Sequence, residues 1–472
     1  MKDIVVLVPG ILGSVFRRNG QIVWGYSARM IGTTLLTAGT RIRDNLILQN
    51  DGPDIDDVDD GITADALMPD LHLMPGFWKI DGYSAVSRTL CESFNLEPGR
   101  NYFEFPYDWR RDNTANAKRL AAAVNKWLAD WRRTGPPDAK AVIVAHSMGG
   151  LIARYYLEVL GGWLEGPARA LITIGTPFRG SLNALRTLVN GVTIGPVEMT
   201  ALSEVCRSWT STYQLLPIFP VYDPGDGALI RVSAASEIPH VCPARARSAL
   251  TFHDEIRNAV TQNRRHPKWE EAGYGIYPIV GRTQLTDYIG RLEGKSLVMS
   301  RLYKGEDLGG DGTVPRVSAI PLEFDDQRRR GDMYATSKHG SLQNTRAVLD
   351  HVAGRINDLY TQFGDFRNVG VAAGEEIALE TSDVLQDDEP LIVRARPGTP
   401  RSLTVMLYAS RNEAPIRVLT LPPSDVEWVE CRFEPLEEGS YRVMVTADKS
   451  MPVEEAIAVA AAPRPAANGA AS

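Results

Sequence analysis

Short apolar runs alternate with amphipathic stretches over the first two thirds of the chain. The apolar runs are rich in β-branched residues, which is typical of buried strands. Residues 114–133 instead carry apolar side chains at helical spacing, and Pro136 and Pro137 follow as a stop signal. Strands that alternate with helices predict a doubly wound, mostly parallel sheet. The predicted strands cover residues 4–8, 141–145, 170–175 and 276–280, with one more ending before Gly309.

The pattern changes after Phe366. From about residue 370 to 460, short alternating runs are separated by turn residues, which predicts a small all-β sandwich. We therefore expect a larger domain over residues 1–366, a β-sandwich over 370–460 and a disordered tail in the Ala- and Pro-rich residues 461–472. The predicted strands of the sandwich are 391–395, 403–408, 416–419, 426–433, 441–447 and 456–459.

Two segments of the larger domain do not fit the alternation. Residues from about 181 to 270 are rich in aromatic residues and proline, and we expect a cap inserted into the sheet. Its Trp209 and Tyr213 either line a groove for a substrate or pack on the core. The loop 68–78 places Phe77 and Trp78 among prolines and a glycine, so it is either a lid that touches a membrane or a buried crossover.

The sequence A-H-S-M-G-G at 145–150 stands between a predicted strand and a predicted helix. A serine on such a sharp turn projects its hydroxyl above the sheet, and the turn needs small residues two positions before and after it. Ala145 and Gly149 meet that need, although the first position is usually glycine. The pattern indicates the nucleophile elbow of an α/β-hydrolase, with Ser147 as the nucleophile.

Such an elbow requires an acid and then a histidine later in the chain. Of the three histidines after residue 260, His351 falls in an apolar-periodic helix and His266 in a charged stretch. His339 lies in a polar turn ahead of the last helix, where a general base belongs. Asp311 is flanked by glycines that let the backbone turn tightly, and it is the predicted acid.

The remaining requirement is a pair of backbone amides for an oxyanion. One is expected from Met148, the residue after the nucleophile. The other is expected from Ile11, because the first predicted strand runs into the turn Pro9-Gly10. An ordinary strand–loop junction is the alternative at this position.

Several short blocks follow one another along the chain: V-P-G-I-L-G-S at 8–14, V-W-G at 23–25, D-G-Y at 81–83, F-P-Y-D-W-R at 105–110, A-H-S-M-G-G-L at 145–151, I-G-T-P-F-R-G-S at 174–181, S-T-Y-Q-L-L-P at 211–217 and G-D-G-T-V-P at 310–315. In this order the blocks resemble the lecithin:cholesterol acyltransferase family, in particular its lysosomal phospholipase A2 and phospholipid:diacylglycerol acyltransferase branches. The resemblance implies the same triad of Ser147, Asp311 and His339, and the same amides of Ile11 and Met148. A pair of early cysteines found in animal members is absent, since only Cys91 lies in this region.

Composition narrows the class of protein. The 472 residues carry a formal net charge of −7 without a basic block, which argues against nucleic acid as a partner. The four cysteines suit a reducing compartment or one optional bridge between Cys206 and Cys242. No metal-ligand spacing, no signal peptide and no run near the roughly 18 apolar residues of a membrane span is present. We expect a cytoplasmic protein without cofactor or metal that contacts membranes peripherally.

These observations predict a serine hydrolase that cleaves acyl esters of lipids, with a phospholipase A or lipase as the first hypothesis. Three alternatives stay open: an acyltransferase, an esterase for small soluble esters, and a non-catalytic hydrolase fold used for interactions. The expected partners are a lipid or phospholipid substrate, a transient membrane contact and a regulatory protein bound through the β-sandwich.

Overall fold

The computed structural model describes residues 1–25, 40–69, 82–164, 167–194, 197–325, 333–360, 377–397, 400–409, 414–424, 427–448 and 452–461. The chain divides into two compact units. The larger is built chiefly from residues up to 373, and the smaller chiefly from those after it.

A six-stranded sheet forms the centre of the larger unit, and every neighbouring pair in it is parallel. The adjacent strands β1 (Ile4–Val8) and β6 (Ala141–His146) are almost entirely apolar and completely buried, as strands covered by helices on both sides must be. The predicted doubly wound parallel sheet is therefore confirmed. Its order is β16 (Met333–Ala335), β11 (Gly275–Gly281), β7 (Ala168–Ile174), β6 (Ala141–His146), β1 (Ile4–Val8) and β5 (Tyr102–Glu104).

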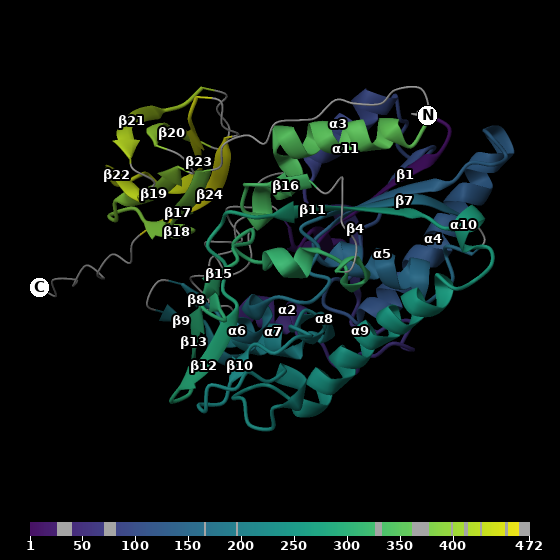
Figure 1. Ribbon diagram of the computed structural model, residues 1–472, viewed down its shortest axis with the longest axis horizontal. Coiled ribbons are helices and arrows are strands. Elements are labelled where there is room, and N and C mark those ends of the chain that lie inside the picture. The colour runs from purple at the N-terminus through teal and green to yellow at the C-terminus, as the bar shows by residue number, and fades with distance from the viewer. Residues whose placement is uncertain are drawn as a thin grey trace, which may run out of the picture. The chain divides into compact units, whose positions relative to one another are not determined.

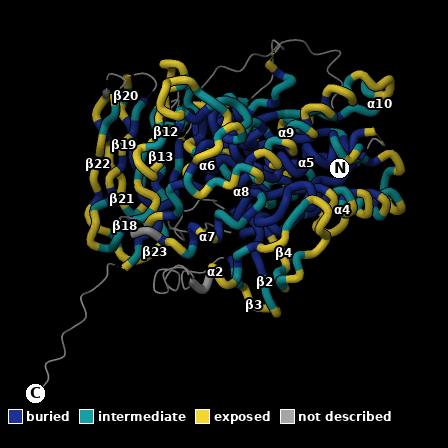
Figure 2. The backbone as a smooth tube through the Cα atoms, turned by 90° about the horizontal axis from the view of Figure 1, so that it is seen from below, coloured by how far each residue is buried: buried dark blue, intermediate teal, exposed yellow. Residues whose placement is uncertain are grey.

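Helices cover both faces of this sheet. Helices α3 (Ser84–Phe94) and α11 (Arg346–Asp358) pack together on one face, and α4 (Asn113–Thr134) and α5 (Met148–Glu158) on the other (Figure 1). The side chain of Asp112 caps α4 by accepting a hydrogen bond from the amide of Thr114. Every residue of α5 is buried, and this helix lies in the dark blue interior of Figure 2.

One predicted strand is wrong in its placement. The residues before Gly309 form β15 (Glu306–Asp307), which pairs only with β14 (Leu302–Tyr303) and does not join the central sheet. The sheet is completed instead by β16, a three-residue strand with one buried side chain. So short a strand, with no apolar run, leaves no signal in the hydrophobic pattern.

The region predicted as a cap is mostly helical. Helix α9 (Pro243–Asn263) packs on α5, the helix that follows Ser147. Strand β10 (Tyr222–Asp223) joins β12 (Ile289–Glu293) and β13 (Ser296–Ser300) in a separate small sheet. The domain boundaries given above stay predictions. The helices of this region are α6 (Leu182–Asn190), α7 (Thr200–Ser208), α8 (Thr210–Gln214), α9 (Pro243–Asn263) and α10 (Trp269–Ala272).

The chain also contains other short elements. Strand β2 (Ser14–Arg18) pairs on its two sides with β3 (Gln21–Trp24) and β4 (Ile62–Leu67), and α2 (Thr40–Leu46) packs on α7. Two short strands, β8 (Thr193–Ile194) and β9 (Val197–Glu198), pair with each other. Three-residue-per-turn helices include η1 (Val232–Ala234), η2 (Arg316–Ala319), η3 (Leu322–Phe324) and η4 (His339–Asn344).

The smaller unit consists of two β-sheets around one apolar core, as the alternating pattern predicts. Val393, Leu403 and Val443 are among its completely buried side chains. One sheet holds β17 (Ile377–Thr381), β19 (Leu391–Pro397) and β22 (Val429–Phe433); the other holds, in order, β18 (Val384–Gln386), β24 (Val453–Ala460), β23 (Gly439–Thr446), β20 (Arg401–Ala409) and β21 (Arg417–Ser424).

All four cysteines are free thiols, so the optional bridge between Cys206 and Cys242 is not formed. Among the described residues, no helix is both long enough and apolar enough to cross a bilayer.

Candidate active site

Ser147 occupies the sharp turn between β6 and α5. Its backbone has φ 51° and ψ −127°, a conformation that costs free energy for any residue with a side chain and is typical of functional sites. The amide of Ser147 donates to the carbonyl of Ile174 on the neighbouring strand, with a distance of 2.9 Å. A β-carbon at Gly149 would lie 2.3 Å from the carbonyl oxygen of Pro9, so the close packing of this turn excludes a side chain there.

A continuous hydrogen-bonded chain connects Ser147, His339 and Asp311. His339 Nδ1 lies 2.7 Å from Asp311 Oδ2, and His339 Nε2 lies 2.8 Å from Ser147 Oγ. Because a carboxylate only accepts, Nδ1 carries the proton and Nε2 accepts the serine hydroxyl. All three side chains are buried. The structure thus brings together the three residues that the sequence analysis selects.

The Asp311 carboxylate is held from both sides. Its Oδ1 accepts hydrogen bonds from the amides of Thr313 at 3.0 Å and Val314 at 2.6 Å, which leaves Oδ2 for His339. The amide of His339 also donates to the carbonyl of Asp311, at 2.8 Å. These contacts fix the acid and the base relative to each other before any substrate arrives.

Asp311 lies just after β15, the strand that was predicted to belong to the central sheet but does not. It reaches the site because its loop lies over the carboxyl end of β11, where a β-carbon at Gly281 would be 2.3 Å from Asp311 Cβ. Gly175, with φ 57°, makes room on the next strand: a β-carbon there would approach Asp311 Oδ2 to 3.0 Å and His339 Nδ1 to 3.1 Å. Neither glycine was predicted as a site residue.

The two residues predicted to supply the oxyanion hole lie beside the serine. Met148 follows Ser147 and opens α5, and Ile11 lines a cavity together with Ser147 and His339. Neither backbone amide donates a hydrogen bond to another described residue. The cavity measures about 10 Å³, close to the space of one water molecule. The other lining residues are Pro177, Ser181, Leu215, Thr313 and Val314.

Four aromatic residues were predicted as candidates for substrate binding, and the structure places two of them. Phe77 and Trp78 lie outside the described residues. Trp209 and Tyr213 are buried and do not line the cavity at Ser147. The Trp209 indole packs edge-on against Trp109 and donates to the carbonyl of Leu46, and the Arg245 guanidinium stacks over the Tyr213 ring. A role of these two residues in substrate binding stays a prediction without a contact to support it.

A larger cavity of about 240 Å³ lies between α5 and α9. Its walls are mostly apolar and include Leu151, Phe178, Ile218 and Ile256, with Arg154 and His253 among the polar residues. Segment 177–181 lines both cavities, since Pro177 faces the one at Ser147 and Phe178 faces the larger one. Two residues that are adjacent in sequence therefore line the two cavities.

The Y-D-W-R block supports the loop that carries Ile11. The hydroxyl of Tyr107 donates to the carbonyl of Pro9 at 2.9 Å, and the amide of Tyr107 donates to Ser14 Oγ at 3.0 Å. The Trp109 ring stacks on Phe16 with a centroid distance of 4.4 Å. Both ends of the turn 9–14 are thus tied to this block.

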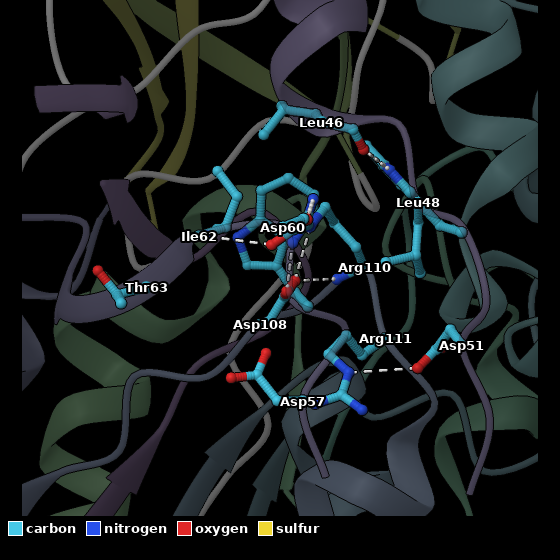
Figure 3. Close-up of polar contacts among 12 residues, drawn as sticks. Leu46, Leu48, Asp51, Asp57, Asp60, Ile62, Thr63, Asp108, Arg110 and Arg111 are labelled. Carbon is cyan, nitrogen blue, oxygen red and sulfur yellow. Dashed lines mark hydrogen bonds and ion pairs between the residues drawn. The ribbon is translucent and has the colours of Figure 1, made fainter. Parts of the chain in front are cut away.

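Buried ion pairs fix the block itself (Figure 3). Arg110 is completely buried and pairs with Asp108 at 2.6 Å and with Asp60 at 2.7 Å, so its charge is compensated. Arg111 pairs with Asp51 at 3.2 Å. Among the described residues, the acidic side chains of segment 51–60 form no group that could hold a metal ion.

A six-stranded parallel sheet with a serine on the strand–helix turn, bonded through a histidine to a buried carboxylate, defines an α/β-hydrolase. The model of the family described as lecithin:cholesterol acyltransferase matches residues 78–284. The chain is therefore similar to this family over less than half of its length, which confirms the resemblance found in the sequence.

Two relatives show how far the sequence similarity extends. The human "Lysosomal phospholipase A and acyltransferase" is 33% identical over 125 residues, which are 25% of this chain and 29% of the relative. The Arabidopsis thaliana "Phospholipid--sterol O-acyltransferase" is 30% identical over 137 residues, 27% of this chain and 22% of the relative. The chain thus matches less than a third of the length of either protein.

Among solved structures, the chain is similar to the Bacillus licheniformis lipase BlEst2, with 13% identity, a TM-score of 0.30 and coverage of 76% of this chain and 92% of that chain. The fold assignment follows from the strand order described above.

Proposed function

We propose that this chain is a serine hydrolase that cleaves acyl esters of lipids, as a phospholipase A or lipase. The observation that carries the proposal is the His339 imidazole, which lies 2.8 Å from the Ser147 hydroxyl and 2.7 Å from the Asp311 carboxylate. A serine with such a base beside it can attack an ester carbonyl at neutral pH.

The proposed reaction has two halves. Ser147 Oγ attacks the carbonyl carbon while its proton moves to His339 Nε2, and the oxyanion is bound by the amides of Ile11 and Met148. The intermediate collapses, the bond to the alcohol breaks, and His339 returns the proton to the leaving oxygen. An acyl-enzyme remains on Ser147. A water molecule, deprotonated by His339, then releases the fatty acid by the same steps in reverse order.

Two observations favour a lipid ester over a small soluble ester. Both relatives described above are named for acting on phospholipids. The cavity between α5 and α9, with more apolar than polar lining residues, offers space for a hydrocarbon chain on the other side of segment 177–178. The same relatives' names include acyltransferase activity, so an alcohol in place of water is the second candidate for resolving the acyl-enzyme.

Mixed phospholipid vesicles test this proposal directly. We expect release of free fatty acid and lysophospholipid by the full chain, and loss of at least about 10⁴-fold in rate in Ser147→Ala. Adding a short-chain alcohol separates the two fates of the acyl-enzyme, because transfer yields an acyl ester in place of fatty acid. Fluorophosphonate labelling followed by peptide mass spectrometry identifies the nucleophile independently. Ser147→Ala with near-wild-type turnover, or labelling at another residue, would contradict the assignment.

A further inference from the structure

A buried tyrosine and a buried histidine join the separate parts of the candidate site, yet neither has a role in the proposed reaction. Tyr83 immediately precedes α3, and His146 is the last residue of β6, directly before Ser147. Both side chains are only 1% exposed. Between them they contact the turn that carries Ile11 and the backbone of the proposed base.

The directions of three hydrogen bonds follow from their chemistry. The amide of Gly10 donates to Tyr83 Oη at 2.7 Å, so the phenolic oxygen is an acceptor there. The single phenolic proton is then directed to His146 Nδ1, at 3.0 Å. His146 therefore carries its own proton on Nε2, which donates to the carbonyl oxygen of His339 at 3.2 Å. Every donor in this series faces an acceptor, and it requires a neutral His146.

We propose that Tyr83 and neutral His146 are positioning residues, which hold the oxyanion-hole turn and the backbone of His339 in register with Ser147. The inference rests on the proposed function. The His146 ring packs against the His339 ring with a centroid distance of 5.1 Å, and its hydrogen bond goes to the His339 carbonyl, so both residues act through the groups they hold. The series spans more than 300 residues of sequence, from Gly10 through Tyr83 and His146 to His339.

Close packing supports this role. A β-carbon at Gly10 would lie 2.9 Å from Ser147 Cβ and 3.2 Å from His146 Nδ1, and one at Gly13 would lie 2.9 Å from Tyr83 Cε2. The turn 10–13 therefore packs directly against Tyr83 and His146. A second clamp acts beside the first, because Gln343 in η4 donates to the carbonyl of Gly82 at 3.0 Å.

The electrostatics agree with a neutral ring. Burial, and after it the proximity of His339, hold the pKa of His146 well below its ordinary value. Burial likewise raises the pKa of Tyr83, so the phenol keeps the proton that it donates. The series is therefore complete across the pH range in which a histidine base works.

Removing one oxygen atom tests the proposal. Tyr83→Phe keeps the ring in place but leaves the Gly10 amide and His146 Nδ1 without this partner, which releases the turn that carries Ile11. Loss of one oxyanion donor, or a displacement of a catalytic group by about 1 Å, typically lowers the catalytic rate on the order of 10²-fold. We expect kcat to fall by about 10- to 100-fold on p-nitrophenyl butyrate, with KM within about twofold of wild type.

Three comparisons distinguish positioning from general loss of stability. Affinity for a trifluoromethyl ketone, whose adduct with serine mimics the oxyanion, should fall by the same factor as kcat in Tyr83→Phe. His146→Gln, which can still accept and donate, should retain more activity than His146→Leu. Tyr155→Phe is the matched control: Tyr155 is also buried and donates to Glu255 at 2.7 Å, away from the candidate site, and its kcat should stay within twofold.

The outcomes separate cleanly. A folded Tyr83→Phe with wild-type kcat overturns the inference while leaving the proposed function intact. If Tyr83→Phe does not fold, the two variants of His146 test the inference instead. Equal activity of His146→Gln and His146→Leu would then overturn it. A kcat loss in Tyr155→Phe as large as that in Tyr83→Phe also overturns it, because the effect would then be general. A wild-type chain that neither turns over the ester nor reacts with fluorophosphonate refutes the proposed function, and the inference falls with it.

Discussion

Replacing Asp311 by asparagine should test the proposed mechanism with almost no change of shape. Two backbone amides, those of Thr313 and Val314, donate to Asp311 Oδ1 at 3.0 and 2.6 Å. In Asp311→Asn, the amide oxygen must take this position, because an NH₂ group there would face two donors. The NH₂ group is then forced toward His339 and donates to Nδ1. His339 must carry its proton on Nε2, where it cannot accept the proton of Ser147.

The magnitude follows from the loss of the general base. The wrong tautomer of a triad histidine costs roughly 10⁴-fold in kcat, equivalent to about 5.4 kcal/mol at 1.36 kcal/mol for each factor of ten. KM should change little, since no substrate contact is removed. The melting temperature should stay near that of wild type, because all polar atoms keep partners.

The assay is steady-state hydrolysis of a short-chain ester and of phospholipid vesicles, with thermal melting of each variant. Asp130→Asn serves as the control, since Asp130 forms ion pairs on the exposed surface of α4 and should leave kcat unchanged. If folded Asp311→Asn retained activity within about tenfold of wild type, the tautomer argument would be refuted and Asp311 would not be the orienting acid.

Three further predictions follow from other parts of the structure. Burial lowers the pKa of His253 to about 4, so the unfolded chain binds a proton that the folded chain does not. The unfolding free energy should therefore fall by up to about 3 kcal/mol through this residue as pH drops from about 6.5 to 4. His253→Gln should weaken the pH dependence of the melting temperature by this contribution, while the contribution of the buried His146 remains, and an unchanged dependence would contradict the prediction. Ile256→Trp should fill part of the cavity between α5 and α9 and lower kcat/KM for long-chain esters more than for butyrate esters; equal effects on both would remove this cavity from the proposal. Leu403→Ala should destabilise the β-sandwich by roughly 2–5 kcal/mol, seen as a lower calorimetric transition, while short-ester turnover persists; loss of turnover with the sandwich would show that it contributes to the active site.

The local elements of this protein follow from its sequence. The strand, turn and helix around Ser147 can be predicted from sequence. An uninterrupted apolar run, small residues at fixed offsets and helical periodicity all lie within about 15 residues of one another there. The same holds for α4, with its stop signal at Pro136, and for β19 and β20, whose inward and outward side chains alternate. Chain order together with local context selects Asp311 and His339, because an elbow requires an acid and then a histidine, and these two lie in a glycine-flanked turn and a polar turn.

How those partners meet was decided by the tertiary structure. Asp311 reaches His339 over the end of β11, and the space it needs comes from Gly175 and Gly281, which no local pattern marks as site residues. The strand β16 that leads toward His339 is too short to leave a hydrophobic signal. Trp209 and Tyr213 look alike as cap aromatics in sequence, and only packing shows them buried away from the cavity.

Tyr83 and His146 show the same division most clearly. His146 was visible in the sequence only as the residue before the nucleophile, and Tyr83 only as part of a family block. Their contacts join residues 73, 63 and 193 positions apart, through loops that carry no periodicity. A hydrophobic pattern reports which face of an element is buried, but it does not report which polar groups the folded chain brings together inside.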